Sequence, residues 1–139
     1  MNRLAAGYCA LVLVVSGSAI ADQRTLVELP SMMQEHMMAN MRDHLAALDE
    51  ILRLLATDRA DSAAEVAEHR LGMSSMDAHG ADHMAPYMPP AMREAGTAMH
   101  SAASRFARKA EEGTAIEAYN VLNEVTAACV TCHAAFRIR

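Results

Sequence analysis

The chain has 139 residues, of which 17 are acidic and 12 are basic. This length suits one domain and is too short for two well-filled hydrophobic cores. The basic residues form no run, which argues against a nucleic-acid partner, and a mild negative charge of this size is most simply explained by solubility.

Residues 1–21 have the pattern of a secretory signal peptide. One positive residue precedes an apolar stretch over residues 10–15, and the small residues Ala19 and Ala21 fit a cleavage site. A membrane anchor is the alternative, but the apolar stretch is much shorter than the roughly 20 residues of a spanning helix. We therefore expect cleavage, a periplasmic location, no membrane attachment afterwards, and a single domain formed by residues 22–139.

A first helix is expected from Ser31 to about Thr57. Ser31 and Gln34 form a capping box, in which each side chain satisfies a backbone N–H near the start of the helix. Apolar residues then recur in alternating steps of three and four, which predicts one buried stripe. This stripe comprises Met38, Met41, Leu45, Leu48, Leu52 and Leu55.

A second, shorter helix is expected to begin between Asp58 and Ser62, because Ser62 and Glu65 offer another capping box. It should end at Gly72, since glycine tolerates the positive φ that often ends a helix. Val66 and Leu71 are its predicted buried residues.

Glycine and proline interrupt the sequence from Gly72 to Pro90, which predicts irregular structure there. A third helix should follow from about Pro90 and end near Gly113. Its apolar stripe comprises Met92, Ala95, Met99, Ala102 and Phe106.

The last helix should open with a capping box of Thr114 and Glu117 and run to about Phe136. Helices with apolar seams and short connections pack as an antiparallel four-helix bundle, so the predicted fold class is all-α. The stripe of this last helix comprises Ala118, Leu122, Val125, Cys129, Cys132 and Phe136.

Cys129, Cys132 and His133 form the most specific motif in the chain. Positions i, i+3 and i+4 share one face of a helix, so both thiols could add to the vinyl groups of one haem while the imidazole reaches the iron. Cys-x-x-Cys-His is the attachment signature of c-type haem. A thiol–disulfide redox pair would normally accompany a βαβ pattern, and a zinc site needs two more ligands at regular spacing. Covalent haem c is therefore the preferred interpretation.

With this motif at its C-terminal end, the chain resembles the class II c-type cytochromes, the cytochrome c-prime group. The resemblance covers essentially all of residues 22–139 and is strongest from Cys129 to Arg137. It implies an antiparallel four-helix bundle that holds one haem, with thioethers from Cys129 and Cys132 and with His133 as the fifth iron ligand. Phe136 would pack against the porphyrin. Arg137 could pair with a propionate, or it could be an ordinary exposed arginine.

The resemblance also makes the sixth iron position decisive. Family members that leave it empty are linked to binding nitric oxide or carbon monoxide, whereas members with a methionine on the first helix transfer single electrons. Alignment with the family's first helix places Met38 at this position, with Met37 or Met41 as substitutes. Met38 could equally be core filler, as methionine in a helical stripe usually is. Gln34 replaces an arginine found in many relatives, which puts one propionate partner in doubt.

The remaining histidines receive less specific expectations. His36 lies about 160° around the helix from Met38 and is expected at the surface. His44 and His100 are expected to be solvated or hydrogen-bonded.

Methionine and histidine crowd residues 69–92, and soft ligands of this kind suggest copper(I). No ligand set repeats at a fixed interval, and methionine is abundant throughout the chain, so packing or surface roles are preferred. The segment comprises His69, Met73, Met76, His79, His83, Met84, Met88 and Met92.

Together these expectations describe a periplasmic mono-haem cytochrome that carries one electron and exchanges it with redox partner proteins. The sequence shows no acid–base pair or substrate pocket, so an enzyme is not expected. Apolar helix faces would also allow a homodimer. The alternative is a five-coordinate haem protein that binds nitric oxide or carbon monoxide, with or without an accessory copper site in residues 69–92.

Overall fold

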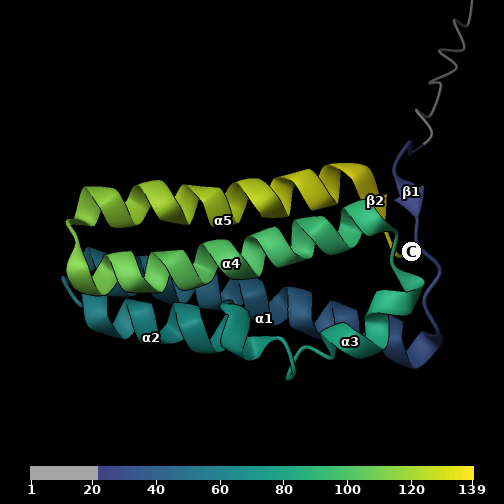
Figure 1. Ribbon diagram of the computed structural model, residues 1–139, viewed down its shortest axis with the longest axis horizontal. Helices are drawn as coiled ribbons and strands as arrows, with labels where there is room; N and C mark the ends of the chain where they lie inside the picture. The colour runs from purple at the N-terminus through teal and green to yellow at the C-terminus, as the bar shows by residue number, and fades with distance from the viewer. Residues whose placement is uncertain (1–21) are drawn as a thin grey trace, which may run out of the picture.

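The computed structural model describes residues 22–139, so the predicted signal peptide lies outside the described part of the chain. The structure is mostly helical, which confirms the all-α prediction (Figure 1). Among the described residues, no helix combines the length and the hydropathy needed to cross a lipid bilayer. The elements are β1 (Thr25–Leu26), α1 (Ser31–Ala56), α2 (Ala60–Arg70), η1 (Met73–Ser75), α3 (Ala81–Met84), η2 (Ala85–Tyr87), α4 (Pro90–Glu112), α5 (Ala115–Ala135) and β2 (Phe136–Arg137).

The four longer helices lie along the long axis of the molecule, and each runs opposite to the one before it (Figure 1). The main helix contacts are α1 with α2, α2 with α4, and α4 with α5. The short elements α3, β1 and β2 gather at one end, where α1 begins and α5 finishes (Figure 1). That end therefore receives the Cys-x-x-Cys-His motif from the last turns of α5.

Helix α1 begins and ends close to where the sequence predicts, but it buries a different face. Each buried residue immediately precedes a member of the predicted stripe, and two stripe members, Leu45 and Leu52, are 70% and 48% exposed. The most deeply buried face is therefore offset by one residue from the predicted stripe, whose other four members are half-buried. The inward face carries polar groups that have partners: the Asn40 side-chain amide donates to the His79 carbonyl at 2.9 Å. The buried residues are Met37, Asn40, His44, Ala47, Ile51 and Leu54.

One of the three predicted capping boxes is present. In α5, the backbone N–H of Glu117 donates to the Thr114 hydroxyl at 3.3 Å, and the Thr114 N–H donates to the Glu117 carboxylate at 2.9 Å. Helix α1 instead starts after Pro30 with no side-chain cap, and the Gln34 side-chain amide donates to the Ile138 carbonyl.

Helix α2 begins at Ala60, within the predicted interval, but its two ends differ in detail from the prediction. Arg59 precedes the first residue of α2 and no side chain caps it, so the predicted capping box there is wrong. The helix ends at Arg70, and Gly72 has a φ of −73°, so no left-handed glycine ends it.

The apolar core has two parts. The larger cluster joins α1, α2, α4 and α5, and its largest fully buried side chains are Ile51, Leu71, Phe106 and Val125. Much of the rest of this cluster is alanine, which allows the helices to approach closely. The smaller cluster, at the motif end of the molecule, consists of buried Val27, Met37, Met84 and Met92 with half-buried neighbours that include Cys132 and Phe136.

The N-terminal and C-terminal segments form a two-stranded parallel sheet that the sequence did not predict. Thr25 is paired with Phe136 and Leu26 with Arg137. The Val27 N–H continues the ladder by donating to the Arg137 carbonyl at 2.8 Å. This pairing fixes the residues that follow α5 beside the start of α1.

The register of α1 can be tested with two alanine substitutions. Ile51→Ala removes a fully buried side chain and should lower the free energy of unfolding by about 2–5 kcal/mol. Leu45→Ala changes a side chain that is 70% exposed and should alter it by less than about 0.5 kcal/mol. Chemical denaturation measures both values. A larger loss of stability in Leu45→Ala than in Ile51→Ala would instead support the buried face predicted from the sequence.

Candidate cofactor site

A cavity of about 610 Å³ lies at the motif end of the molecule. Its volume falls within the roughly 300–1,000 Å³ that is common for small-molecule and cofactor sites. Five of the six predicted site residues border it: Met38, Cys132, His133, Phe136 and Arg137. The structure thus brings the first helix, the end of α5 and the C-terminal strand around one space.

The sixth residue, Cys129, does not border the cavity. It is half-buried one turn earlier on α5 and packs against the larger core, whereas Cys132 packs with the smaller cluster. Both cysteines are free thiols, and burial raises the pKa of each. His133 is exposed near the end of α5.

Methionine dominates the apolar lining of the cavity. The three candidates for the sixth iron ligand, Met37, Met38 and Met41, all border it. Met37 is buried, and the other two are half-buried, so the structure does not single out Met38. Four methionines of the segment 69–92 also line the cavity, which agrees with the packing role that the sequence favoured. The lining methionines are Met37, Met38, Met41, Met76, Met84, Met88, Met92 and Met99.

The cavity wall is positively charged, although the described chain is acidic. Arg24, Arg93, Arg137 and Arg139 line it with a single carboxylate, that of Asp82. Four positive charges and one negative charge give the lining residues a formal charge of +3, of which the Asp22 carboxylate, in contact with Arg24 and Arg137, offsets one. Such a wall favours an anionic ligand or one with carboxylate groups.

Arg137 carries an unsatisfied donor at this wall. Its Nε is buried and makes no hydrogen bond in the described part of the chain. The nearest recorded carboxylate, that of Asp22, is 3.6 Å away. Asp22 is already paired with Arg24 at 2.7 Å, and that hydrogen bond lowers the pKa of the Asp22 carboxyl well below its usual range. A buried guanidinium N–H without a partner is costly, so Arg137 has capacity to bind one more acceptor.

Three histidines that are distant in sequence are buried together beside the cavity. The ring centroids of His44 and His79 are 4.7 Å apart, those of His79 and His100 are 5.3 Å apart, and those of His44 and His100 are 5.8 Å apart. We call these residues the histidine trio. His44 and His100 also border the cavity.

Of the two roles expected for His44 and His100, the hydrogen-bonded one is correct. His100 Nδ1 lies 2.7 Å from the Leu71 carbonyl, and His44 Nε2 lies 3.5 Å from His79 Nδ1. The sequence missed the trio because it assigned the wrong face of α1 to the core. His36, in contrast, is exposed as predicted.

Burial keeps the trio neutral. It is the main reason that the pKa of His44 is lowered to about 4, and the nearby rings of His79 and His100 contribute to the same shift. The pKa values of His79 and His100 are also lowered, and burial is again the main cause.

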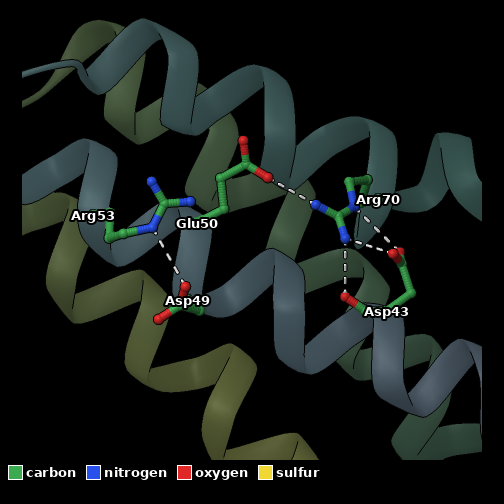
Figure 2. A network of polar contacts seen from close by, with 5 residues as sticks. All are labelled: Asp43, Asp49, Glu50, Arg53 and Arg70. Atoms are coloured by element: carbon green, nitrogen blue, oxygen red, sulfur yellow. Dashed lines mark hydrogen bonds and ion pairs between the residues drawn. The ribbon is translucent and has the colours of Figure 1, made fainter.

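An ion-pair network fixes α1 against α2 next to the trio. Figure 2 shows Arg70 of α2 between Asp43 and Glu50 of α1. The Arg70 hydrogen bond lowers the pKa of the Asp43 carboxyl, which keeps it ionised beside His44. Arg70 therefore reinforces the rotation of α1 that turns His44 inward.

Comparison with known proteins gives no match to a family model, to a curated protein or to a solved structure. The class of protein is therefore argued from the motif, the cavity and the helix arrangement.

Acid should destabilise the metal-free protein between about pH 6.5 and pH 4. An unfolded histidine binds its proton near pH 6.5, whereas folded His44 does so only near pH 4. Between these pH values the unfolded state therefore binds more protons than the folded state. His44 alone should lower the free energy of unfolding by about 3 kcal/mol at pH 4. Denaturation at a series of pH values measures this loss.

Two variants identify the source of the effect. His44→Gln should flatten the pH dependence, whereas His83→Gln, at an exposed histidine, should leave it unchanged. If the wild type and His44→Gln lost stability equally across the window, the acid sensitivity would lie elsewhere.

Proposed function

We propose that this protein is a periplasmic mono-haem c-type cytochrome that carries single electrons. One observation carries the proposal: Cys132 and His133, from a complete Cys-x-x-Cys-His motif, border the same cavity as three methionines of α1. The chemistry of the motif supplies covalent attachment and an axial imidazole. The cavity supplies the space that the cofactor needs.

The helix arrangement supports an antiparallel four-helix bundle of the class II type. Helices α1, α2, α4 and α5 run in alternating directions along the molecule, and the motif lies on the last of them (Figure 1). In such bundles, cofactors are held by side chains on facing helices. Here α1 and α5 supply the two sides of the proposed haem site.

The residues present fit haem in polarity and charge. The porphyrin face is apolar and the two propionates are anionic, which matches methionine lining together with four arginines at the wall. The unsatisfied Nε of Arg137 would gain an acceptor from a propionate. Cys129 lies three residues before Cys132, on the same helix face, and its free thiol would form the second thioether. Haem held here would supply a one-electron iron centre.

The chain's own side chains then have separate tasks. His133 presents an imidazole beside the two attachment points, and half-buried Phe136 contributes an aromatic face to the cavity. The methionines exclude water, and β1 holds the segment after α5 in place through its pairing with β2. A dry site with a fixed axial ligand suits electron transfer because little has to rearrange when the charge changes.

Met38 is our proposed sixth ligand, and redox proteins are the proposed partners. The alternative function is a five-coordinate haem protein that binds nitric oxide or carbon monoxide. The observation that favours it is the spread of methionines around the cavity, since no single one is positioned as the obvious ligand.

Covalent haem is the first prediction to test. The protein should be produced in a host with a periplasmic haem-attachment system, and attachment measured by haem staining after denaturing electrophoresis. Wild type should carry one haem, and the double variant Cys129→Ser with Cys132→Ser should carry none, because no thioether can form. Val130→Ala, at a residue inside the motif that is 67% exposed, is the matched control and should retain haem. Wild-type protein without covalent haem would contradict the proposal.

The sixth ligand is tested by optical spectra of Met37→Ala, Met38→Ala and Met41→Ala. If Met38 ligates, wild type should be low-spin and respond little to carbon monoxide, and only Met38→Ala should become high-spin. Its reduction potential should also fall, because a thioether ligand stabilises ferrous iron. A high-spin wild type that binds carbon monoxide readily would instead support the gas-binding alternative.

A further inference from the structure

The histidine trio forms a second candidate site that the proposed haem chemistry does not use. His44 comes from α1, His79 from the turn between η1 and α3, and His100 from α4. All three side chains are buried, although histidine is commonly only partly buried. Each neutral imidazole has one N–H donor and one nitrogen lone pair that is free to bind a metal ion.

The spacing of one nitrogen pair matches that of two ligands on one metal ion. His44 Nε2 and His79 Nδ1 are 3.5 Å apart. Two imidazole nitrogens bound to one ion at about 2.0–2.1 Å lie about 3.3–3.6 Å apart in tetrahedral or trigonal geometry. Ring centroids in such a site lie about 5–5.5 Å apart by the same geometry, which is close to the separations in the trio.

Hydrogen bonds prepare two of the three residues for this role. A carbonyl only accepts, so His100 Nδ1 donates its hydrogen to the Leu71 carbonyl at 2.7 Å, and Nε2 keeps a lone pair. No hydrogen bond to His100 Nε2 is present among the described residues. Metal-binding histidines are oriented in this way, with the other ring nitrogen donating to a carbonyl or carboxylate. The backbone of His79 is held by the side-chain amide of Asn40 at 2.9 Å.

Ser75 does not satisfy the trio by itself. Its hydroxyl donates its only hydrogen to the Gly72 carbonyl at 2.7 Å. It can therefore only accept a hydrogen from His79 Nδ1, 3.3 Å away, and only in the tautomer that carries the hydrogen on Nδ1. His44 Nε2 and His79 Nδ1 can share one hydrogen bond, and their separation makes that hydrogen bond weak.

The rings do not yet surround one point. Within residues 22–139, no three histidine, cysteine, aspartate or glutamate side chains are already arranged to hold a metal ion. Ion binding at the trio thus requires the imidazoles to rotate. The cavity that His44 and His100 border offers a route of entry.

The charge of the surroundings selects the ion. The three ligands are neutral, the Asp43 carboxylate beside His44 is already paired with Arg70 (Figure 2), and arginines line the adjoining cavity. An ion of charge +1 costs less to bury there than one of charge +2. Copper(I) carries one charge, accepts three-coordinate imidazole sites and tolerates the thioethers that line the adjoining cavity.

We propose that His44, His79 and His100 bind one copper(I) ion at the inner wall of the cavity. This site differs from the copper site considered from the sequence within residues 69–92, because two of its ligands lie outside that segment. His69 and His83, which belong to the segment, are exposed and take no part.

Anaerobic competition for copper(I) against a chromogenic chelator tests the proposal on the purified protein. Wild type should bind one equivalent, and His44→Gln, His79→Gln and His100→Gln should each weaken binding at least tenfold. His36→Gln, His69→Gln and His83→Gln alter exposed histidines and should bind as wild type does. No stoichiometric copper(I) binding by the wild type would overturn the proposal, as would equal losses in the exposed-histidine variants.

A second measurement needs no variant and so does not depend on whether the substituted proteins fold. X-ray absorption of the copper-loaded wild type should show nitrogen ligands at about 1.9–2.1 Å, whereas a shell dominated by sulfur would place the ion on the cysteines or methionines and overturn the assignment. The double Cys129→Ser and Cys132→Ser protein should keep its copper site. The haem and copper proposals can therefore fail independently.

Discussion

The rotation of α1 about its own axis determines what both ends of the molecule enclose. Toward its C-terminus, the inward face presents Ala47, Ile51 and Leu54 to the larger core. Toward its N-terminus, the same face presents Met37 to the smaller cluster and His44 to the histidine trio. A shift by one residue, about 100° of rotation, would expose His44 and replace it with Leu45. The trio would then be lost, and the wall of the cavity would be rebuilt.

Two features hold α1 in this rotation. Arg70 of α2 pairs with Asp43 and Glu50, which lie beside the buried face (Figure 2). These groups are partly exposed, so each pair contributes only modestly to stability, but together they favour one orientation of α1 over its neighbours. Asn40 supplies the second feature, because its amide reaches the His79 carbonyl only when it points inward. Loss of the hydrogen-bond partner of a buried polar group lowers stability by more than a surface ion pair raises it.

The sequence was most informative about the buried faces of α4 and α5. Phe106 of α4 and Val125 of α5 were predicted to be buried and are, and the cap at Thr114 is present. On α1, leucine and methionine occur on adjacent faces, so periodicity could not decide between two rotations one residue apart. The polar residues Asn40 and His44 favoured the wrong rotation of α1, because their burial depends on partners far along the chain.

For the candidate site, the sequence identified some residues and missed others. Residues close together in sequence, such as Cys132 and His133, could be recognised from spacing alone. His79 could not, because it joins His44 and His100 only after the irregular segment between α2 and α4 has folded. The pairing of β1 with β2 gave no signal either, since two residues per strand are too few to establish a period.

The distribution of charge around the cavity links the two proposed sites. Arginines at the wall favour a ligand with carboxylates, while the histidine trio is neutral because burial disfavours its charged form. If both proposals hold, an ion bound by the trio would place a positive charge beside the same cavity. That charge would favour the reduced, less positive state of an iron centre held there. Occupancy of the trio would then shift the reduction potential upward, so the metal bound by three neutral histidines would tune the redox site.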